Sequence, residues 1–166
     1  MKYRTGFLMY LAAFFLQPFL QNLIPVFGGH VNLILCLTVM LTFLYEETLP
    51  GILFGFIFGL LYDMVYGMYT GPGVLALMVT GIGILVLREF FNIENFFNAL
   101  ITALLSTWLY ATVFWGVYVV LGSPYSYLYA MKSLPLQFLF NCAVCMTLYF
   151  ILIKRVIKHR RDRYFR

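Results

Sequence analysis

A single acidic residue stands inside a long apolar stretch, and it shares a four-residue spacing with glycines. The stretch covers residues 50–67, PGILFGFIFGLLYDMVYG, and the spaced positions are Gly51, Gly55, Gly59, Asp63 and Gly67. Four residues are slightly more than one helical turn, so these positions form a ridge with little side-chain bulk along one side of a helix. A second helix can approach such a ridge closely, and an acid on it needs a polar partner. We therefore expect the ridge to dock a partner helix.

Asp63 itself has two interpretations. It lies about 20 Å along its helix from the start, which places it near the far end of a membrane span. In the functional interpretation it contacts a partner helix, lines a small cavity or pairs with His30. In the other, it hydrogen-bonds a neighbouring helix of the same chain and only stabilises the fold. The glycine ridge also has two interpretations. It could dock a partner helix, or another span of this chain could pack against it equally well.

Other residues that could do chemistry are scattered. The sequence has no phosphate-binding glycine loop, no H-E-x-x-H and no G-x-S-x-G motif, and its six acids do not cluster. Its two histidines and three cysteines lack the spacing of a metal site, so we expect no metal, no cofactor and no enzymatic activity. Trp and Tyr residues of the fifth apolar segment are candidates to line a pocket for a flat ligand, although such residues also fill packing gaps and anchor interfaces.

The composition is that of a membrane protein. The chain has 166 residues, of which 63% are hydrophobic and 10% are charged. A soluble domain carries about 25% charged residues. We therefore predict an all-α polytopic membrane protein with a single integral domain.

Six apolar segments approach the length needed to cross a hydrocarbon core, which is about 20 residues per helix. We expect these spans at residues 5–23, 31–44, 50–66, 73–87, 96–121 and 135–153. Because it carries the ridge, the third span is expected to be the helix around which the others are organised.

The distribution of basic residues predicts the orientation. Seven of the eleven Lys and Arg residues follow Ile153, in a tail at 154–166. Six spans place both termini on one side, and the excess of cations marks that side as cytoplasmic. We expect the tail to contact anionic lipids or the inner membrane surface, and we consider nucleic acid a weaker partner. The candidate residues are Lys154, Arg155, Lys158, Arg160, Arg161 and Arg163.

The third segment also carries the pattern of a known family. The pattern is G-x-x-x-G-L-x-x-D followed by a glycine-rich turn, and here it consists of Gly55, Gly59, Leu60 and Asp63 followed by Gly67, Gly71 and Gly73. With an Asn at the start of a short second span, Asn32, and six expected spans, the chain resembles the rod shape-determining protein MreD family. The match of individual residues covers Asn32 and residues 50–73.

This resemblance implies a multi-pass protein of the bacterial inner membrane that has no reaction of its own. It implies binding to the single-span protein MreC and links to MreB filaments, to the peptidoglycan polymerase RodA and to its transpeptidase partner. The family is similar in fold to the substrate-binding S-components of energy-coupling transporters. A small-molecule-binding S-component is therefore the alternative function, with its pocket between the outer ends of the helices.

Overall fold

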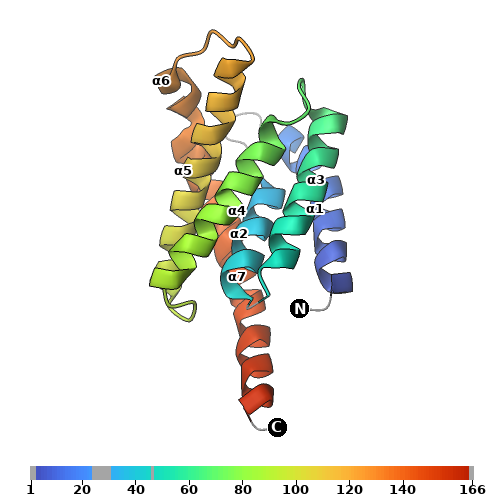
Figure 1. The fold of residues 1–166 in the computed structure, drawn as a ribbon, viewed down its shortest axis with the longest axis vertical. Helices are drawn as coiled ribbons and strands as arrows, with labels where there is room; N and C mark the ends of the chain where they lie inside the picture. Colours follow the sequence, from blue (N-terminus) through green and yellow to red (C-terminus); the bar gives the residue numbers. More distant parts are fainter. Residues whose placement is uncertain (1–2, 24–30, 46, 165–166) are drawn as a thin grey trace.

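A computed structural model of the chain describes residues 3–23, 31–45 and 47–164, without the side chains of 23, 155 and 157–164. The described residues form helices and connecting turns, and they contain no strand. Figure 1 shows a bundle whose two chain ends lie at the same end of the molecule. The elements are α1 (Tyr3–Leu23), α2 (Leu33–Leu44), α3 (Leu49–Tyr66), α4 (Pro72–Phe90), α5 (Phe96–Val120), α6 (Tyr127–Ala130), the 3₁₀-helix η2 (Met131–Ser133) and α7 (Leu134–Tyr164).

The second helix, rather than the third, lies at the centre of the bundle. α2 has 12 residues, and all of those from Ile34 to Leu44 are buried. It packs against α1, α3, α4, α5 and α7, which surround it in Figure 1. A helix that is apolar on every side is stable only when other helices cover it. The expectation that the third span is central is therefore wrong, and the uniform apolarity of α2 is the reason.

Proline, asparagine and glycine residues determine where several helices begin and end. Asn32 caps α2, because its side chain accepts a hydrogen bond from the backbone N–H of Leu35 at 2.9 Å. Pro50 and Pro72 lie in the first turns of α3 and α4, where a missing N–H leaves no bond unmade. These signals explain why the expected and observed bounds of α2, α3 and α4 agree within a few residues.

Within the described residues, four helical segments are long and apolar enough to cross a membrane, with mean hydropathy between 1.6 and 2.0; the last of them runs from α6 through η2 into α7. They are Leu49–Tyr66, Pro72–Phe90, Phe96–Val120 and Tyr127–Lys154. α2 is apolar but shorter, and α1 carries amide side chains in its last two turns. The chain is thus an all-helical, multi-pass membrane protein, while six spans remain a prediction.

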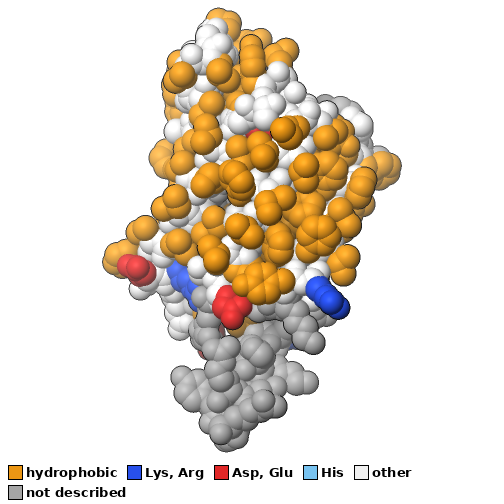
Figure 2. Space-filling model, turned by 45° about the vertical axis from the view of Figure 1, so that its right-hand side comes forward, with side chains coloured by type: hydrophobic (Ala, Val, Ile, Leu, Met, Phe, Trp, Pro, Cys, Tyr) orange, Lys and Arg blue, Asp and Glu red, His pale blue; other side chains and the backbone are white. Residues whose placement is uncertain are grey.

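Apolar side chains cover the outside of the helices. Figure 2 shows them over most of one face, whereas the Lys and Arg side chains visible in that view lie near the end that holds the termini. Exposed examples on different helices are Phe15, Phe90 and Phe97, at 66%, 77% and 68%. Such a surface fits contact with lipid rather than with water.

Candidate functional site

Asp63 connects the end of α3 to the start of α4. Three backbone N–H groups at the start of α4 donate hydrogen bonds to its Oδ2 atom. The donors are Gly71, Gly73 and Val74, at 3.1, 2.8 and 3.1 Å. The first N–H groups of a helix have no partner within the helix, and the helix dipole favours a negative charge at that end. Asp63 therefore has a satisfied, mostly buried position inside this chain.

The glycines of the turn make this arrangement possible. Gly71 has a φ of 126°, a conformation that other residues rarely adopt. A Cβ atom on Gly73 would collide with the Asp63 carboxylate, and one on Gly67 would lie 2.5 Å from the Asp63 carbonyl oxygen. The aspartate and the glycines that follow it therefore form one structural unit, which we call the Asp63 turn.

Two glycines of the ridge face α2. A Cβ atom on Gly51 would lie 2.7 Å from Thr42 Oγ1, and one on Gly55 would lie 2.5 Å from Thr38 Oγ1. Thr38 is held in place by Tyr10 of α1, whose hydroxyl lies 3.0 Å from Thr38 Oγ1 and donates to the Gly51 carbonyl at 2.8 Å. The missing side chains thus let α3 pack closely on α2 and α1.

The next glycine faces α4. A Cβ atom on Gly59 would lie 2.5 Å from the Cδ1 atom of Leu77. With Gly51 and Gly55 against α2 and Asp63 bonded to α4, the ridge from Gly51 to Asp63 is covered by helices of the same chain. Only Gly67, at the end of α3, is exposed. A partner helix has no access to the covered glycines in this conformation, in which they pack against helices of the same chain.

The basic tail continues the last helix instead of forming a separate segment. α7 extends from Leu134 to Tyr164 without interruption. Lys154 is exposed, whereas the side chains of Arg155, Lys158, Arg160, Arg161 and Arg163 lie outside the described part of the structure. Lipid contact by these residues stays a prediction, and His30 is likewise outside the described residues.

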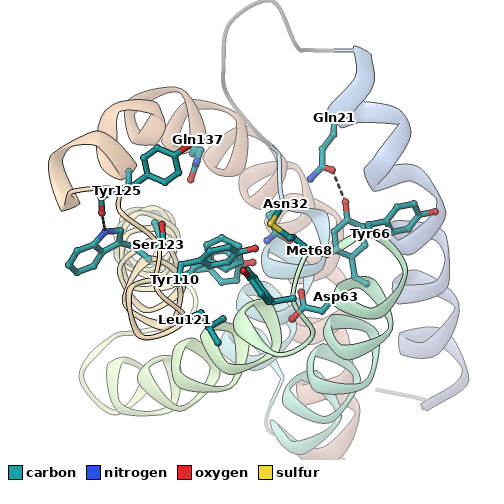
Figure 3. A pocket seen from close by; sticks show the side chains of 18 of the residues that line it. Gln21, Asn32, Asp63, Tyr66, Met68, Tyr110, Leu121, Ser123, Tyr125 and Gln137 are labelled. Atoms are coloured by element: carbon teal, nitrogen blue, oxygen red, sulfur yellow. Dashed lines mark hydrogen bonds between the residues drawn. The ribbon is translucent and has the colours of Figure 1, made fainter.

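A cavity of about 980 Å³ lies at the end of the bundle that is opposite to the chain termini. It is lined by the last turns of α1, α3 and α5, the first turns of α7, and the segment after α5. Asp63 is one of its lining residues and links the Asp63 turn to the cavity. Figure 3 shows the labelled side chains converging on this space from several helices.

Amide side chains in the cavity wall are fixed by hydrogen bonds. Gln17 accepts from the backbone N–H of Ile34 at 3.2 Å, and Gln21 accepts from the Tyr62 hydroxyl at 2.6 Å. On the other side of the cavity, Asn141 Oδ1 accepts from the backbone N–H of Asn32 at 3.0 Å. These bonds hold α1, α2, α3 and α7 together at their ends and orient the polar part of the wall.

Aromatic residues of α5 form another wall. The rings of Tyr110 and Phe114 lie 5.8 Å apart and nearly parallel, and those of Phe114 and Tyr118 lie 4.8 Å apart. All three rings line the cavity, as does Trp115, whose indole N–H donates to the Tyr125 carbonyl at 3.0 Å. Trp108 is not among the lining residues. The expectation that aromatic residues of this segment line a pocket holds for its second half.

Sequence reasoning missed the amides of the cavity. Gln17 and Gln21 are one turn apart near the end of α1, a spacing that marks a polar face on an otherwise apolar helix. The sequence therefore contains a signal for these two residues. It contains none for the contact between Asn32 and Asn141, because they are far apart in the chain. Among the described residues, no group of three His, Cys, Asp or Glu side chains is placed to hold a metal ion.

Comparisons with protein families, with curated proteins and with solved structures find no match for this chain.

Proposed function

We propose that this chain is a non-enzymatic membrane scaffold of the bacterial cell-elongation machinery, which binds an MreC-like single-span protein and supports peptidoglycan synthesis and rod shape. The observation that carries the proposal is the Asp63 turn. Asp63, Gly67, Gly71 and Gly73 are the second half of the pattern on which the resemblance to the MreD family rests, and they form one contact between α3 and α4. A sequence pattern whose residues contact one another in the fold is stronger support for a family resemblance than apolar composition. Unrelated membrane proteins also have an apolar composition.

A partner helix has to bind outside the filled ridge. The opposite face of α3 presents Leu53, Phe56, Ile57 and Met64, which are exposed. Helices associate in a membrane mainly through close packing, so an exposed apolar face is a suitable surface. We assign partner docking to the outward faces of the helices, with both termini on the cytoplasmic side. MreB, RodA and its transpeptidase are the further partners proposed.

Photo-crosslinking in native membranes tests this proposal. A photo-reactive residue is placed, one at a time, at exposed positions on four helices, namely Phe56, Val86, Leu105 and Phe150. Capture of a single-span protein with a large external domain from one face, together with round cells after depletion, is the expected result. Capture of only intramolecular products from all four positions, with normal cell shape after depletion, would refute the scaffold.

The cavity favours a second candidate function, which is the binding subunit of an energy-coupling transporter. Its volume of about 980 Å³ is at the upper end of the usual range for small-molecule sites. In this case crosslinking would capture an ATPase-linked coupling subunit, and growth would fail only when one nutrient is scarce. Those two results separate the candidates, because a scaffold of cell elongation is needed in every medium.

A further inference from the structure

The cavity combines three features that together suit it to hold a ligand. It is large, it lies at one end of the bundle, and its wall contains many hydrogen-bonding side chains. Its described lining has six amide residues, among them Gln17, Asn32 and Asn141, and eight phenol or indole groups, among them Tyr110 and Trp115. Polar groups inside a membrane are expensive, and they concentrate where they serve a fold or a ligand.

Part of this polar wall is already prepared for binding. Gln17 and Asn141 are almost fully buried, at 2% exposure each, and both accept bonds from backbone N–H groups. The amides are therefore held in one orientation before any ligand arrives. Asn141 also donates through Nδ2 to Thr107 Oγ1 at 3.5 Å, so these two amides fix the shape of the wall. The less buried amides, Gln21, Asn22 and Asn32, remain accessible to a ligand in a wall that is already ordered, which lowers the entropy cost of binding.

The aromatic wall of α5 offers a hydroxyl group as well as apolar surface, because Tyr110 is part of it. The Tyr110 ring stacks on Phe114, and the Phe114 ring lies tilted by 39° beside Tyr118, so neighbouring rings cover part of their flat surface. Figure 3 shows the hydroxyl end of Tyr110 directed toward the middle of the cavity, toward Asn32 and Asp63. This wall therefore offers hydrogen bonds together with the edges of aromatic rings.

Formal charge is nearly absent from the described lining. Asp63 is its one charged residue, and the described lining includes no Lys, Arg or His; the nearest such residue in sequence, Lys132, follows the lining residue Met131 and is exposed. The Oδ2 atom of Asp63 already accepts three backbone N–H bonds from the positive end of α4, which offsets much of its charge. An anion would find no cation among the described lining residues, and a cation would have to compete with the α4 N-terminus for the carboxylate.

From these features we infer that the cavity is a binding site for an uncharged, hydrogen-bond-rich organic molecule, such as a neutral sugar or nucleoside-sized compound. Removing a charge from water without a counter-charge is costly, which disfavours charged ligands. Amides and phenols supply donors and acceptors for hydroxyl, carbonyl and ring-nitrogen groups. This inference rests on the cavity alone, so its failure would leave the scaffold proposal standing.

The test uses the purified full-length chain in lipid nanodiscs. A Trp108→Phe background leaves Trp115 of the cavity wall as the one tryptophan, because the sequence has two. Its fluorescence is followed during titration with matched sets that differ in charge: adenosine against adenosine monophosphate, and N-acetylglucosamine disaccharide against the glucosamine disaccharide and glucuronate. Native mass spectrometry of protein from its own membranes identifies any ligand that copurifies.

We expect an uncharged member of the panel, or an uncharged copurified ligand, to bind at least about tenfold more tightly than its charged counterparts. Ala111→Phe fills the cavity from the α5 wall and should weaken that binding at least about tenfold. Ala143→Phe is the matched control, because Ala143 is exposed on α7 and does not line the cavity.

Three results would overturn the inference. The first is equal or tighter binding of the charged counterparts. The second is the absence of an uncharged ligand both from the panel and from the native preparation. The third is unchanged binding in Ala111→Phe, which would place the ligand elsewhere. Binding without any growth dependence on the compound would support the site while contradicting the transporter role.

Discussion

Asp63 and Gly73 lie on consecutive helices, and the backbone N–H of Gly73 donates to Asp63 Oδ2 at 2.8 Å, the shortest of the three bonds that the carboxylate accepts from α4. The glycine at this position has a second role, since any Cβ atom there would displace the carboxylate. Gly73 thus donates a hydrogen bond to the carboxylate and, because it has no side chain, also leaves the space that the carboxylate occupies. The first two predictions concern this pair.

Removal of the Asp63 carboxylate should destabilise the fold. In Asp63→Ala three N–H groups at the start of α4 lose their acceptor, which we expect to cost about 3 kcal/mol of unfolding free energy. Asp63→Asn retains an acceptor oxygen and should cost about 1 kcal/mol. Thermal unfolding of purified protein in one detergent measures both. An Asp63→Ala protein as stable as the unmodified chain would show that the carboxylate does not support the turn.

A methyl group on Gly73 should have a similar effect, because it would push the Asp63 carboxylate out of place. Gly73→Ala is therefore expected to lower the unfolding midpoint. Gly116→Ala is its matched control, since a Cβ atom there meets nothing within 4 Å. Alanine is the better helix former by about 1 kcal/mol, so the control should be neutral or more stable. The explanation fails if the two variants have the same midpoint.

Close packing of α3 on α2 predicts a rescue experiment. A Cβ atom on Gly55 would lie 2.5 Å from Thr38 Oγ1 and 3.1 Å from its Cγ2 atom. Gly55→Ala should therefore destabilise the protein by about 1–3 kcal/mol, the usual cost of overpacking. Thr38→Ala removes both obstructing atoms, so adding it to Gly55→Ala should cost less than the sum of the two changes.

The double-mutant cycle is read from unfolding midpoints of the four proteins. A coupling energy near zero would mean that Gly55 and Thr38 do not meet as described. Tyr10→Phe provides a separate reference, because it removes the hydroxyl next to Thr38 without changing the space beside Gly55.

The predicted topology is open to a labelling test. Ser123 lies at the cavity end of the bundle, and Lys154 lies on α7 toward the end with the termini. In a chain whose three native cysteines are replaced, Ser123→Cys should react with a membrane-impermeant maleimide on intact cells. Lys154→Cys should react only after the membrane is opened. The reverse pattern would place both termini outside the cytoplasm.

Local signals in the sequence predict most helix bounds but not the centre of the fold. Pro50 and Pro72 mark helix starts, and Asn32 predicts the start of α2. The last span was expected to end at residue 153, and the apolar part of the structure ends at Lys154, whereas α7 continues to Tyr164, because charge ends a membrane span without ending a helix. Lys and Arg are good helix formers, so the helix continues through them.

The sequence predicts that Asp63 needs a polar partner, but it does not predict which groups that partner consists of. An acid inside an apolar helix requires compensation, and that physical rule applies to any sequence. Whether the compensating group belongs to another protein or to the turn that follows depends on how the chain folds back after Tyr66. The cavity was less predictable still, since Gln21, Asn32 and Asn141 come from separate segments and meet only in the folded bundle.

Because α7 is one long continuous helix, a small tilt at one of its ends moves the other end by a larger distance. Its 31 residues correspond to about 46 Å, which exceeds the thickness of the hydrocarbon core. Asn141, near one end, belongs to the cavity wall, and the basic segment forms the other end. A tilt of about 5° around the cavity end would displace the basic end by about 3–4 Å, from the length alone. A small rearrangement around the cavity would thus be enlarged on the opposite side of the membrane.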